Sequence, residues 1–311
     1  MGKNKSFHRL KKLGANIVEH AKKISLPLFD SVPLYDVALF FWRSIVDGSI
    51  TTRASAIAFS FFMAFFPFVI FLFTLIPYIP IDNFQEELFA IMQQIVPDST
   101  FPTIERTMDT IEDILFEKNV SWLSIGFFIA LIFSTNGLAS MMSAFDATIH
   151  SIQRRSWWSQ RITAIYLLII LSVLLTVAIA MLTGGQDLIN YLNRKDIIRD
   201  DSMVILLTVS KWIINVGLFF FAYSFLYYFA PAKKTKWRFI SAGGSLATLL
   251  SIVTFYGFTY YINNFSQYNA LYGSISTLLI ILLLMYIMSL ILLIGFELNA
   301  SIYQARSHLE E

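Results

Sequence analysis

Three charged side chains stand at the edges of long apolar segments, where their chemistry would be charge pairing or contact with a substrate. Arg53 begins one such segment, Asp146 ends a second, and Glu297 ends a third. A charged group at membrane depth costs free energy unless it is paired or faces a polar path. We predict that Glu297 pairs with Arg53 or with another base at that level. The alternative is that each side chain reaches the membrane interface separately.

One proline and a polar patch lie deeper in these segments. Pro67 stands in the middle of the first segment and should kink a helix there, because it removes a backbone hydrogen bond. The freed carbonyl needs a partner, and Ser134-Thr135-Asn136-Gly137 in the second segment could supply one or could itself interrupt a helix. A kinked helix beside a polar patch is typical of transporter sites. Small and polar residues are equally typical of helix packing in membranes.

The last long apolar stretch supplies the remaining candidates. It runs from Phe239 to Phe296 without a charged residue or histidine. Because a bilayer core needs only about 20 residues, the stretch must fold back, and we place the turn in the amide-rich string Asn263–Asn269. Gly243-Gly244-Ser245, followed by Ala247, predicts a close-packing face in the first half of the stretch. The candidate substrate path or structural polar cluster therefore consists of Arg53, Pro67, Asn136, Asp146, Tyr268, Asn269, Tyr272, Gly273, Glu297 and Asn299.

Residue patterns for catalysis are missing from the sequence. The four histidines lie outside the apolar segments, there is no cysteine, and HExxH, GxSxG and P-loop motifs do not occur. The sequence therefore predicts no catalytic residue, no metal, no cofactor and no ATP-driven pump.

Six membrane-spanning helices are the elements that must position these residues. Hydrophobic residues make up 56% of the chain and charged residues 14%, against roughly 25% charged residues in ordinary soluble domains. The predicted spans are Ala54–Ile81, Asn119–Phe145, Ile162–Gln186, Trp212–Ala232 and two within Phe239–Phe296. The predicted fold class is an all-α polytopic membrane protein with additional interfacial amphipathic helices.

Lysine and arginine predict the orientation of the spans. They are concentrated before the first span, between the second and third, and between the fourth and fifth, whereas residues 82–118 hold nine acids and two bases. Both termini are therefore predicted to be cytoplasmic, in a bacterial inner (plasma) membrane. The predicted organisation is a basic tail with interfacial helices at 1–52, a six-helix membrane domain at 53–305 with an acidic external cap at 82–118, and a cytoplasmic tail at 306–311.

Membrane lipids are the predicted partners. Phe7–Ile24 combines apolar residues at helical spacing with Lys and Arg, which predicts contact with the anionic inner leaflet. A disordered basic tail that only sets the topology is the alternative. A net charge of +2 argues against nucleic acid as a partner, and a homo-oligomer is compatible with the sequence.

Three motifs in a fixed order carry a family resemblance. They are Arg53-Ala54-Ser55-Ala56 leading to Pro67, Tyr268-Asn269-Ala270-Leu271-Tyr272-Gly273-Ser274, and Gly295-Phe296-Glu297-Leu298-Asn299-Ala300. With them the chain, from about Leu34 to Tyr303, resembles the YihY/virulence factor BrkB family of inner-membrane proteins, formerly labelled ribonuclease BN. Members commonly have a basic residue near the polar patch of the second span, where Asn136 stands here. The resemblance implies a role in envelope integrity, with lipid or glycolipid movement as a suggested activity.

Three functions follow as hypotheses. The first is a transporter-like or flippase-like protein for an amphipathic or envelope-related substrate, not driven by ATP. The second is a non-catalytic membrane scaffold, and a membrane ribonuclease or hydrolase ranks last. A water-filled cavity that reaches Glu297 or Asn136 would favour transport, whereas a dry bundle with these groups paired to each other would favour a scaffold.

Overall fold

The computed structural model describes residues 32–47, 49–75, 120–148, 155–194, 201–232, 239–264 and 274–310, with residues 19, 22, 24–25 and 28–29. These residues form helices and no named strand. The helices are α2 (Leu34–Asp47), α3 (Ile50–Leu75), α6 (Val120–Thr148), α7 (Trp157–Arg194), α8 (Asp201–Phe229), α9 (Ala242–Asn264) and α11 (Ser274–Glu310). Residues 82–118, Tyr268, Asn269, Tyr272, Gly273 and most of Phe7–Ile24 lie outside the described residues.

Six of these helices, all except α2, are long and apolar enough to cross a bilayer. This confirms the predicted all-α fold with six spans. The helix boundaries differ from those of the predicted spans. α8 begins at Asp201, so Lys211 lies inside a candidate span, whereas the sequence prediction began that span at Trp212. α11 continues to Glu310, past residue 305.

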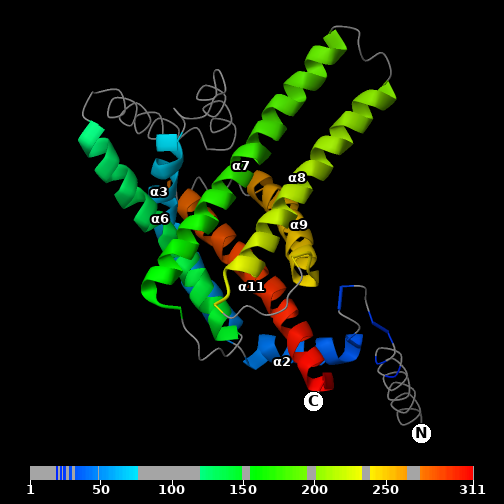
Figure 1. Cartoon of the computed structure of the whole chain (residues 1–311). Coiled ribbons are helices and arrows are strands. Elements are labelled where there is room, and N and C mark those ends of the chain that lie inside the picture. Colours follow the sequence, from blue (N-terminus) through cyan, green and yellow to red (C-terminus); the bar gives the residue numbers. More distant parts are fainter. Residues whose placement is uncertain are drawn as a thin grey trace.

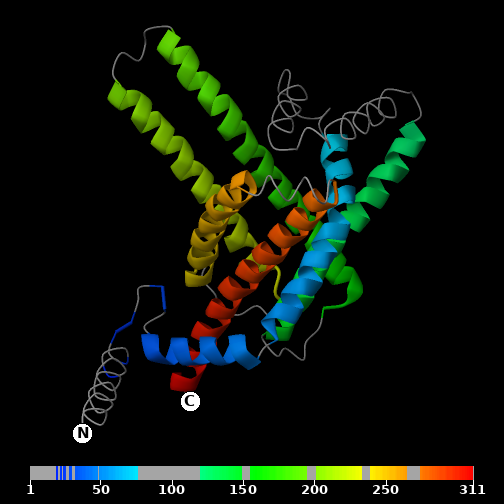
Figure 2. The ribbon, with the colours of Figure 1, turned by 180° about the vertical axis from the view of Figure 1, so that it is seen from behind.

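α11 is the central helix of the bundle. It packs against α2, α3, α6 and α9, while α7 packs between α6 and α8. Figures 1 and 2 show α11 running diagonally through the molecule, with α3 and α6 on one side and α9 on the other. α3 remains helical through Pro67, and Figure 2 shows its C-terminal end turning away from the direction of its first part.

α2 is a short amphipathic helix that lies across the C-terminal end of α11 (Figure 1). Its Val37 is buried in a small cluster with Ile302 and Ala305 of α11, while Trp42 on another face is exposed. Ser49 has a φ of 46°, and the chain turns there from α2 into α3. The sequence placed interfacial helices in residues 1–52 but did not single out this segment.

The crossing of α9 and α11 depends on two glycines. A Cβ added at Gly243 would lie 1.9 Å from the carbonyl oxygen of Gly295, and one added at Gly295 would lie 2.6 Å from the carbonyl oxygen of Gly243. Only glycine allows two backbones to approach this closely. The predicted close-packing face at Gly243-Gly244-Ser245 is confirmed at Gly243.

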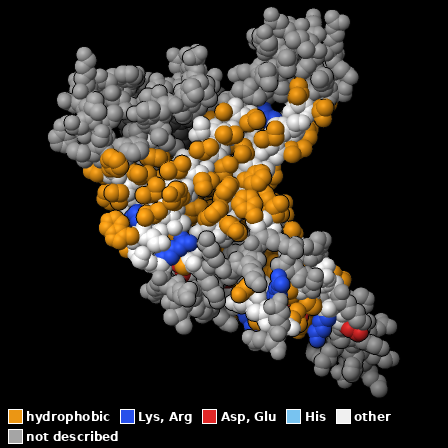
Figure 3. Space-filling view, viewed as in Figure 1, with side chains coloured by type: hydrophobic (Ala, Val, Ile, Leu, Met, Phe, Trp, Pro, Cys, Tyr) orange, Lys and Arg blue, Asp and Glu red, His pale blue; other side chains and the backbone are white. Residues whose placement is uncertain are grey.

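The outer surface of the described helices is largely apolar. Figure 3 shows hydrophobic side chains covering this face, with Lys and Arg side chains near the edges of the apolar area. Such a surface would be unstable in water and suits contact with acyl chains. The described helices therefore position their polar residues mainly at helix contacts and at helix ends.

Candidate functional site

Glu297 of α11 is the centre of a polar cluster at one end of the bundle. Its Oε1 accepts hydrogen bonds from Arg53 Nη2 at 2.5 Å and from Thr148 Oγ1 at 2.9 Å. Its Oε2 accepts a hydrogen bond from Ser44 Oγ. Arg53 also donates through Nη1 to Thr148 Oγ1 and, at 3.2 Å, to the carbonyl oxygen of Ala144. The cluster thus joins α2, α3, α6 and α11.

The Glu297 cluster satisfies a charge that has no contact with solvent. The Glu297 side chain is 0% exposed and that of Arg53 is 15% exposed. Because removing one partner from such a pair leaves an uncompensated charge, the pair constrains all the helices that contribute to it. The structure therefore contains the predicted pairing of Glu297 with Arg53. Ser44 and Thr148 were not predicted, because single hydroxyl residues near helix ends carry no distinctive sequence signal.

An aromatic layer lies next to the Glu297 cluster. Phe145 of α6 and Phe296 of α11 stack with ring centroids 3.8 Å apart and planes 2° from parallel. Tyr227 of α8 packs against both rings and donates a hydrogen bond of 2.9 Å to the carbonyl oxygen of Leu292. All three side chains are almost fully buried. They fill the space where α6, α8 and α11 meet.

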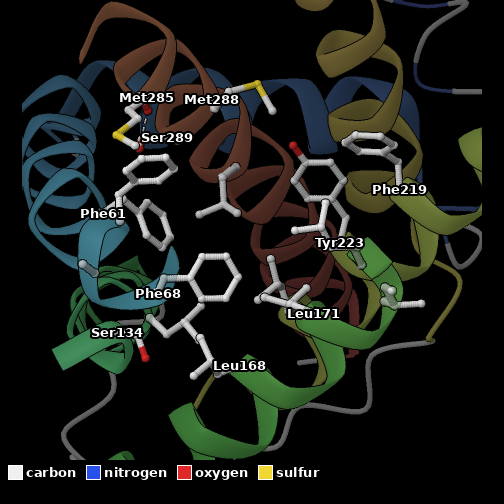
Figure 4. Close-up of a pocket in the computed structure, with 18 of the residues that line it drawn as sticks. Phe61, Phe68, Ser134, Leu168, Leu171, Phe219, Tyr223, Met285, Met288 and Ser289 are labelled. Atoms are coloured by element: carbon white, nitrogen blue, oxygen red, sulfur yellow. Dashed lines mark hydrogen bonds between the residues drawn. The ribbon is translucent and has the colours of Figure 1, made fainter. Parts of the chain in front are cut away.

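A cavity of about 470 Å³ lies on the other side of the aromatic layer. Its lining comes from α3, α6, α7, α8 and α11, and Figure 4 shows Phe61, Phe68, Leu168, Phe219 and Met288 around it. Its volume is within the range of small-molecule pockets, about 300–1,000 Å³. The wall is almost entirely apolar, which fits a hydrocarbon chain.

The few hydroxyls in the cavity wall are already hydrogen-bonded. Ser134 and Ser289 donate to carbonyl oxygens of their own helices at 2.9 and 2.7 Å. Tyr223 shares a hydrogen bond of 2.5 Å with Ser251 of α9. The cavity therefore presents no unpaired polar group from these residues and favours an apolar occupant.

The cavity and the Glu297 cluster are separate along the helices. On α11 the cavity-lining Leu292 precedes Phe296 and Glu297, and on α6 Leu138 precedes Phe145. The lining includes neither Glu297 nor Asn136. The aromatic layer therefore lies between the cavity and the cluster along α6 and α11, and the apolar cavity differs from the water-filled path that the sequence suggested as one alternative.

Asp146 belongs to a different contact from that of Glu297. Its Oδ1 accepts a hydrogen bond of 2.8 Å from the backbone N–H of Ala232, just after α8. Arg155, just before α7, donates through Nη2 to the carbonyl oxygens of Phe229 and Pro231 at 3.3 and 2.9 Å. Burial lowers the pKa of Arg155, and the charge of Asp146 opposes this shift. These bonds fasten the adjacent ends of α6, α7 and α8.

Asn136 lies at the contact between α6 and α7. Its Oδ1 accepts a hydrogen bond of 2.9 Å from Arg161 Nη1 of α7. The neighbouring Ser134 and Thr135 donate to carbonyl oxygens within α6, at 2.9 and 2.6 Å. The hydroxyls of Ser134 and Thr135 therefore do not serve the carbonyl freed by Pro67, and α6 continues as a helix through this patch. Arg161 was overlooked as a site residue because its charge was used only to predict orientation.

Asn299 reinforces the crossing of α9 and α11. Its Oδ1 accepts the N–H of Gly243 at 2.8 Å, and its Nδ2 donates to Ser241 Oγ at 3.0 Å. Ser241 Oγ also accepts the N–H of Gly244, so the start of α9 is capped from both sides. Asn299 therefore has a packing role separate from the Glu297 cluster.

Comparison with known proteins identifies one family and several relatives of the chain. A family described as virulence factor BrkB matches residues 41–311. The putative ribonuclease-like protein YfkH of Bacillus subtilis is 26% identical over 82% of this chain and 90% of its own. A UPF0761 membrane protein of Haemophilus influenzae is 23% identical over 90% of this chain and 100% of its own. No solved structure matches the chain significantly.

Proposed function

Because the chain belongs to the virulence factor BrkB family of multi-pass membrane proteins, we propose that it moves an amphipathic, envelope-related molecule across the membrane without ATP. The apolar cavity among α3, α6, α7, α8 and α11 is the observation that carries this proposal. An amphipathic molecule brings a hydrocarbon part that needs an apolar site, and the cavity wall offers one.

The contacts around the cavity suggest how access would alternate. The aromatic layer of Phe145, Tyr227 and Phe296 and the pair of Arg53 with Glu297 lie between the cavity and the α2 end of the bundle, where they would act as the closed gate. Transporters expose a central site to each side of the membrane in turn. In this proposal the described state is closed at the α2 end, and opening that end requires the Arg53–Glu297 pair to separate.

A non-catalytic scaffold is the second candidate. Two observations favour it: both oxygens of Glu297 are paired with groups of α2, α3 and α6, and the cavity wall includes neither Glu297 nor Asn136. By the criterion stated for the sequence these observations support a scaffold, whereas the apolar cavity supports transport. In this case the cluster fixes the helices permanently and nothing passes through the cavity. The name of the Bacillus subtilis relative describes that protein, and we propose no nuclease reaction for this chain.

The test is lipid movement by purified protein in vesicles. Phospholipids and a glycolipid that carry a fluorescent label would be placed in both leaflets, and an added reductant that cannot cross the membrane would reveal how fast the inner label emerges. Protein vesicles without ATP should lose more signal than empty vesicles for at least one labelled lipid. A panel in which wild type and Glu297→Gln both remain at background would refute transport and leave the scaffold.

A cavity variant distinguishes specific movement from leakage. Ala222 lines the cavity on α8, so Ala222→Phe should fill it and lower the rate toward background. Ala56 of α3 is exposed and does not line the cavity, so Ala56→Phe makes the same change as a matched control and should keep the rate. Equal rates for the two variants would show that the cavity is not the path.

A further inference from the structure

Arg161 is held against α6 by one of its nitrogens. Nη1 donates to the carbonyl oxygen of Ile132 at 3.0 Å, to Thr135 Oγ1 at 2.5 Å and to Asn136 Oδ1 at 2.9 Å. Nε and Nη2 make no hydrogen bond to the described residues. The guanidinium is therefore oriented by α6 and still has donors for a further acceptor.

Two exposed tryptophans precede Arg161 by about one helical turn, and one of them lies near its guanidinium. Trp157 and Trp158 precede Arg161 by four and three residues, and they are 56% and 71% exposed. The Cζ of Arg161 lies 5.3 Å from the centre of the Trp157 ring, a distance at which the ring attracts the cation. Exposed tryptophans at the start of a membrane span are typical of the headgroup level.

Exposed apolar side chains continue from Arg161 along both helices. On α6 these are Ile132 and Phe133, and on α7 they are Ile162 and Tyr166. They provide a surface for acyl chains that begins at the level of the guanidinium. A water-soluble anion would gain nothing from this surface, whereas a lipid would use both parts.

We propose that Arg161, oriented by Asn136 and adjacent to Trp157, binds the phosphate of an anionic phospholipid from the surrounding bilayer. The free donors of a guanidinium match two phosphate oxygens, and the acyl chains lie along the exposed faces of α6 and α7. Asn136 and Thr135 position the guanidinium and do not themselves need to touch the lipid. The site is independent of transport, because a scaffold would bind such a lipid equally well.

A purely structural function of Arg161 is the competing explanation. The α6–α7 contact already has a polar tie, since Gln160 Nε2 donates to Ala139 O and Ser143 Oγ, both at 3.0 Å. Exposed tryptophans at the headgroup level are expected under either explanation, so they do not decide between the two. The two explanations differ in whether replacing Arg161 changes the binding of one lipid headgroup more than that of another.

The test is lipid binding by the full-length purified protein, measured by mass spectrometry that preserves bound lipids. Phosphatidylglycerol, phosphatidylcholine and inorganic phosphate would be titrated separately and in competition. Wild type should retain phosphatidylglycerol over phosphatidylcholine. Arg161→Gln should weaken phosphatidylglycerol binding roughly tenfold or more, the effect of losing a charge-assisted hydrogen bond. Phosphatidylcholine binding should weaken less, because its choline group already offsets the charge of its phosphate.

Further variants keep the test decisive if Arg161→Gln does not fold. Arg161→Lys keeps the charge but loses the two-point geometry and should weaken binding less, and Trp157→Ala should weaken it without removing a charge. Arg43→Gln removes an exposed base on α2 and should leave binding unchanged. Equal phosphatidylglycerol binding by wild type, Arg161→Lys and Trp157→Ala would overturn the proposal. Full displacement of the lipid by inorganic phosphate would also overturn it, because the ligand would then be free phosphate.

Discussion

Replacement of Gly243 by alanine should separate α9 from α11. The new Cβ would lie 1.9 Å from the carbonyl oxygen of Gly295 and 2.7 Å from the Asn299 side chain, far inside normal contact distance. Because Gly295 presents backbone rather than a flexible side chain at this point, the helices must move apart. The hydrogen bond from Gly243 N–H to Asn299 is then stretched or lost.

The magnitude follows from the effects that compete at this position. Overpacking costs about 1–3 kcal/mol and the lost hydrogen bond costs about 1 kcal/mol, while the better helix propensity of alanine returns up to about 1 kcal/mol. Gly257 of the same helix has no atom within 4 Å of an added Cβ. Gly257→Ala therefore gains propensity without the clash, and the two variants should differ in unfolding free energy by about 2–4 kcal/mol.

Reversible unfolding in mixed detergent micelles, followed by circular dichroism, measures this difference. The comparison is between two Gly→Ala changes in one helix, and the gain in propensity is smaller at Gly243, in the first turn, than at Gly257, in the interior, so propensity and clash change the stability in the same order. If Gly243→Ala proved as stable as Gly257→Ala, the close crossing of α9 and α11 at these glycines would be wrong. A stable Gly243→Ala with normal Asn299 contacts would refute the reasoning in the same way.

The same unfolding assay tests three further expectations. Arg53→Met should lower the unfolding free energy by about 3 kcal/mol, because it leaves Glu297 buried without its cation. The double variant Arg53→Met with Glu297→Met should lose clearly less than the sum of the two single variants. Strictly additive losses would contradict the pairing. Tyr227→Phe should cost about 1 kcal/mol, since it removes the hydrogen bond to Leu292 O, and an unchanged midpoint would argue against that bond. Asp146→Asn keeps an acceptor for the backbone N–H of Ala232 and should therefore destabilise the protein less than Asp146→Ala. The opposite order would show that the charge of Asp146 contributes more to stability than this hydrogen bond.

The spans were predictable because burial in lipid demands long apolar helices, and charge marks where they end. The pairing of Arg53 with Glu297 followed from the same logic, since both residues stand at one level of the bundle. The start of α8 was misplaced because Lys211 was treated as a boundary, although a long basic side chain can lie within a span and extend toward the interface. The backbone of α8 continues for ten residues before it.

Other features of the site could not be predicted, because the sequence gives the depth of a residue along a span more reliably than the direction in which its side chain points around the helix. Asp146 and Thr148 are neighbours at the end of α6, yet Thr148 contacts Glu297 while Asp146 contacts Ala232. Their directions depend on how α6 is rotated against its neighbours. The cavity was likewise invisible in the sequence, because it is the space left between apolar residues of five helices.

The length of α7 has a mechanical consequence. Its 38 residues extend about 57 Å at about 1.5 Å per residue, whereas the hydrocarbon core is about 30 Å thick. Figure 1 shows the joined ends of α7 and α8 projecting beyond the other described helices, while the polar contacts of Arg155 and Asp146 fasten only the opposite end. A force on the projecting end therefore acts at a long distance from the polar contacts that hold the other end. A thicker or more tightly packed bilayer would press on the projecting end and change the tilt of the helix pair, and with it the width of the cavity that the pair borders.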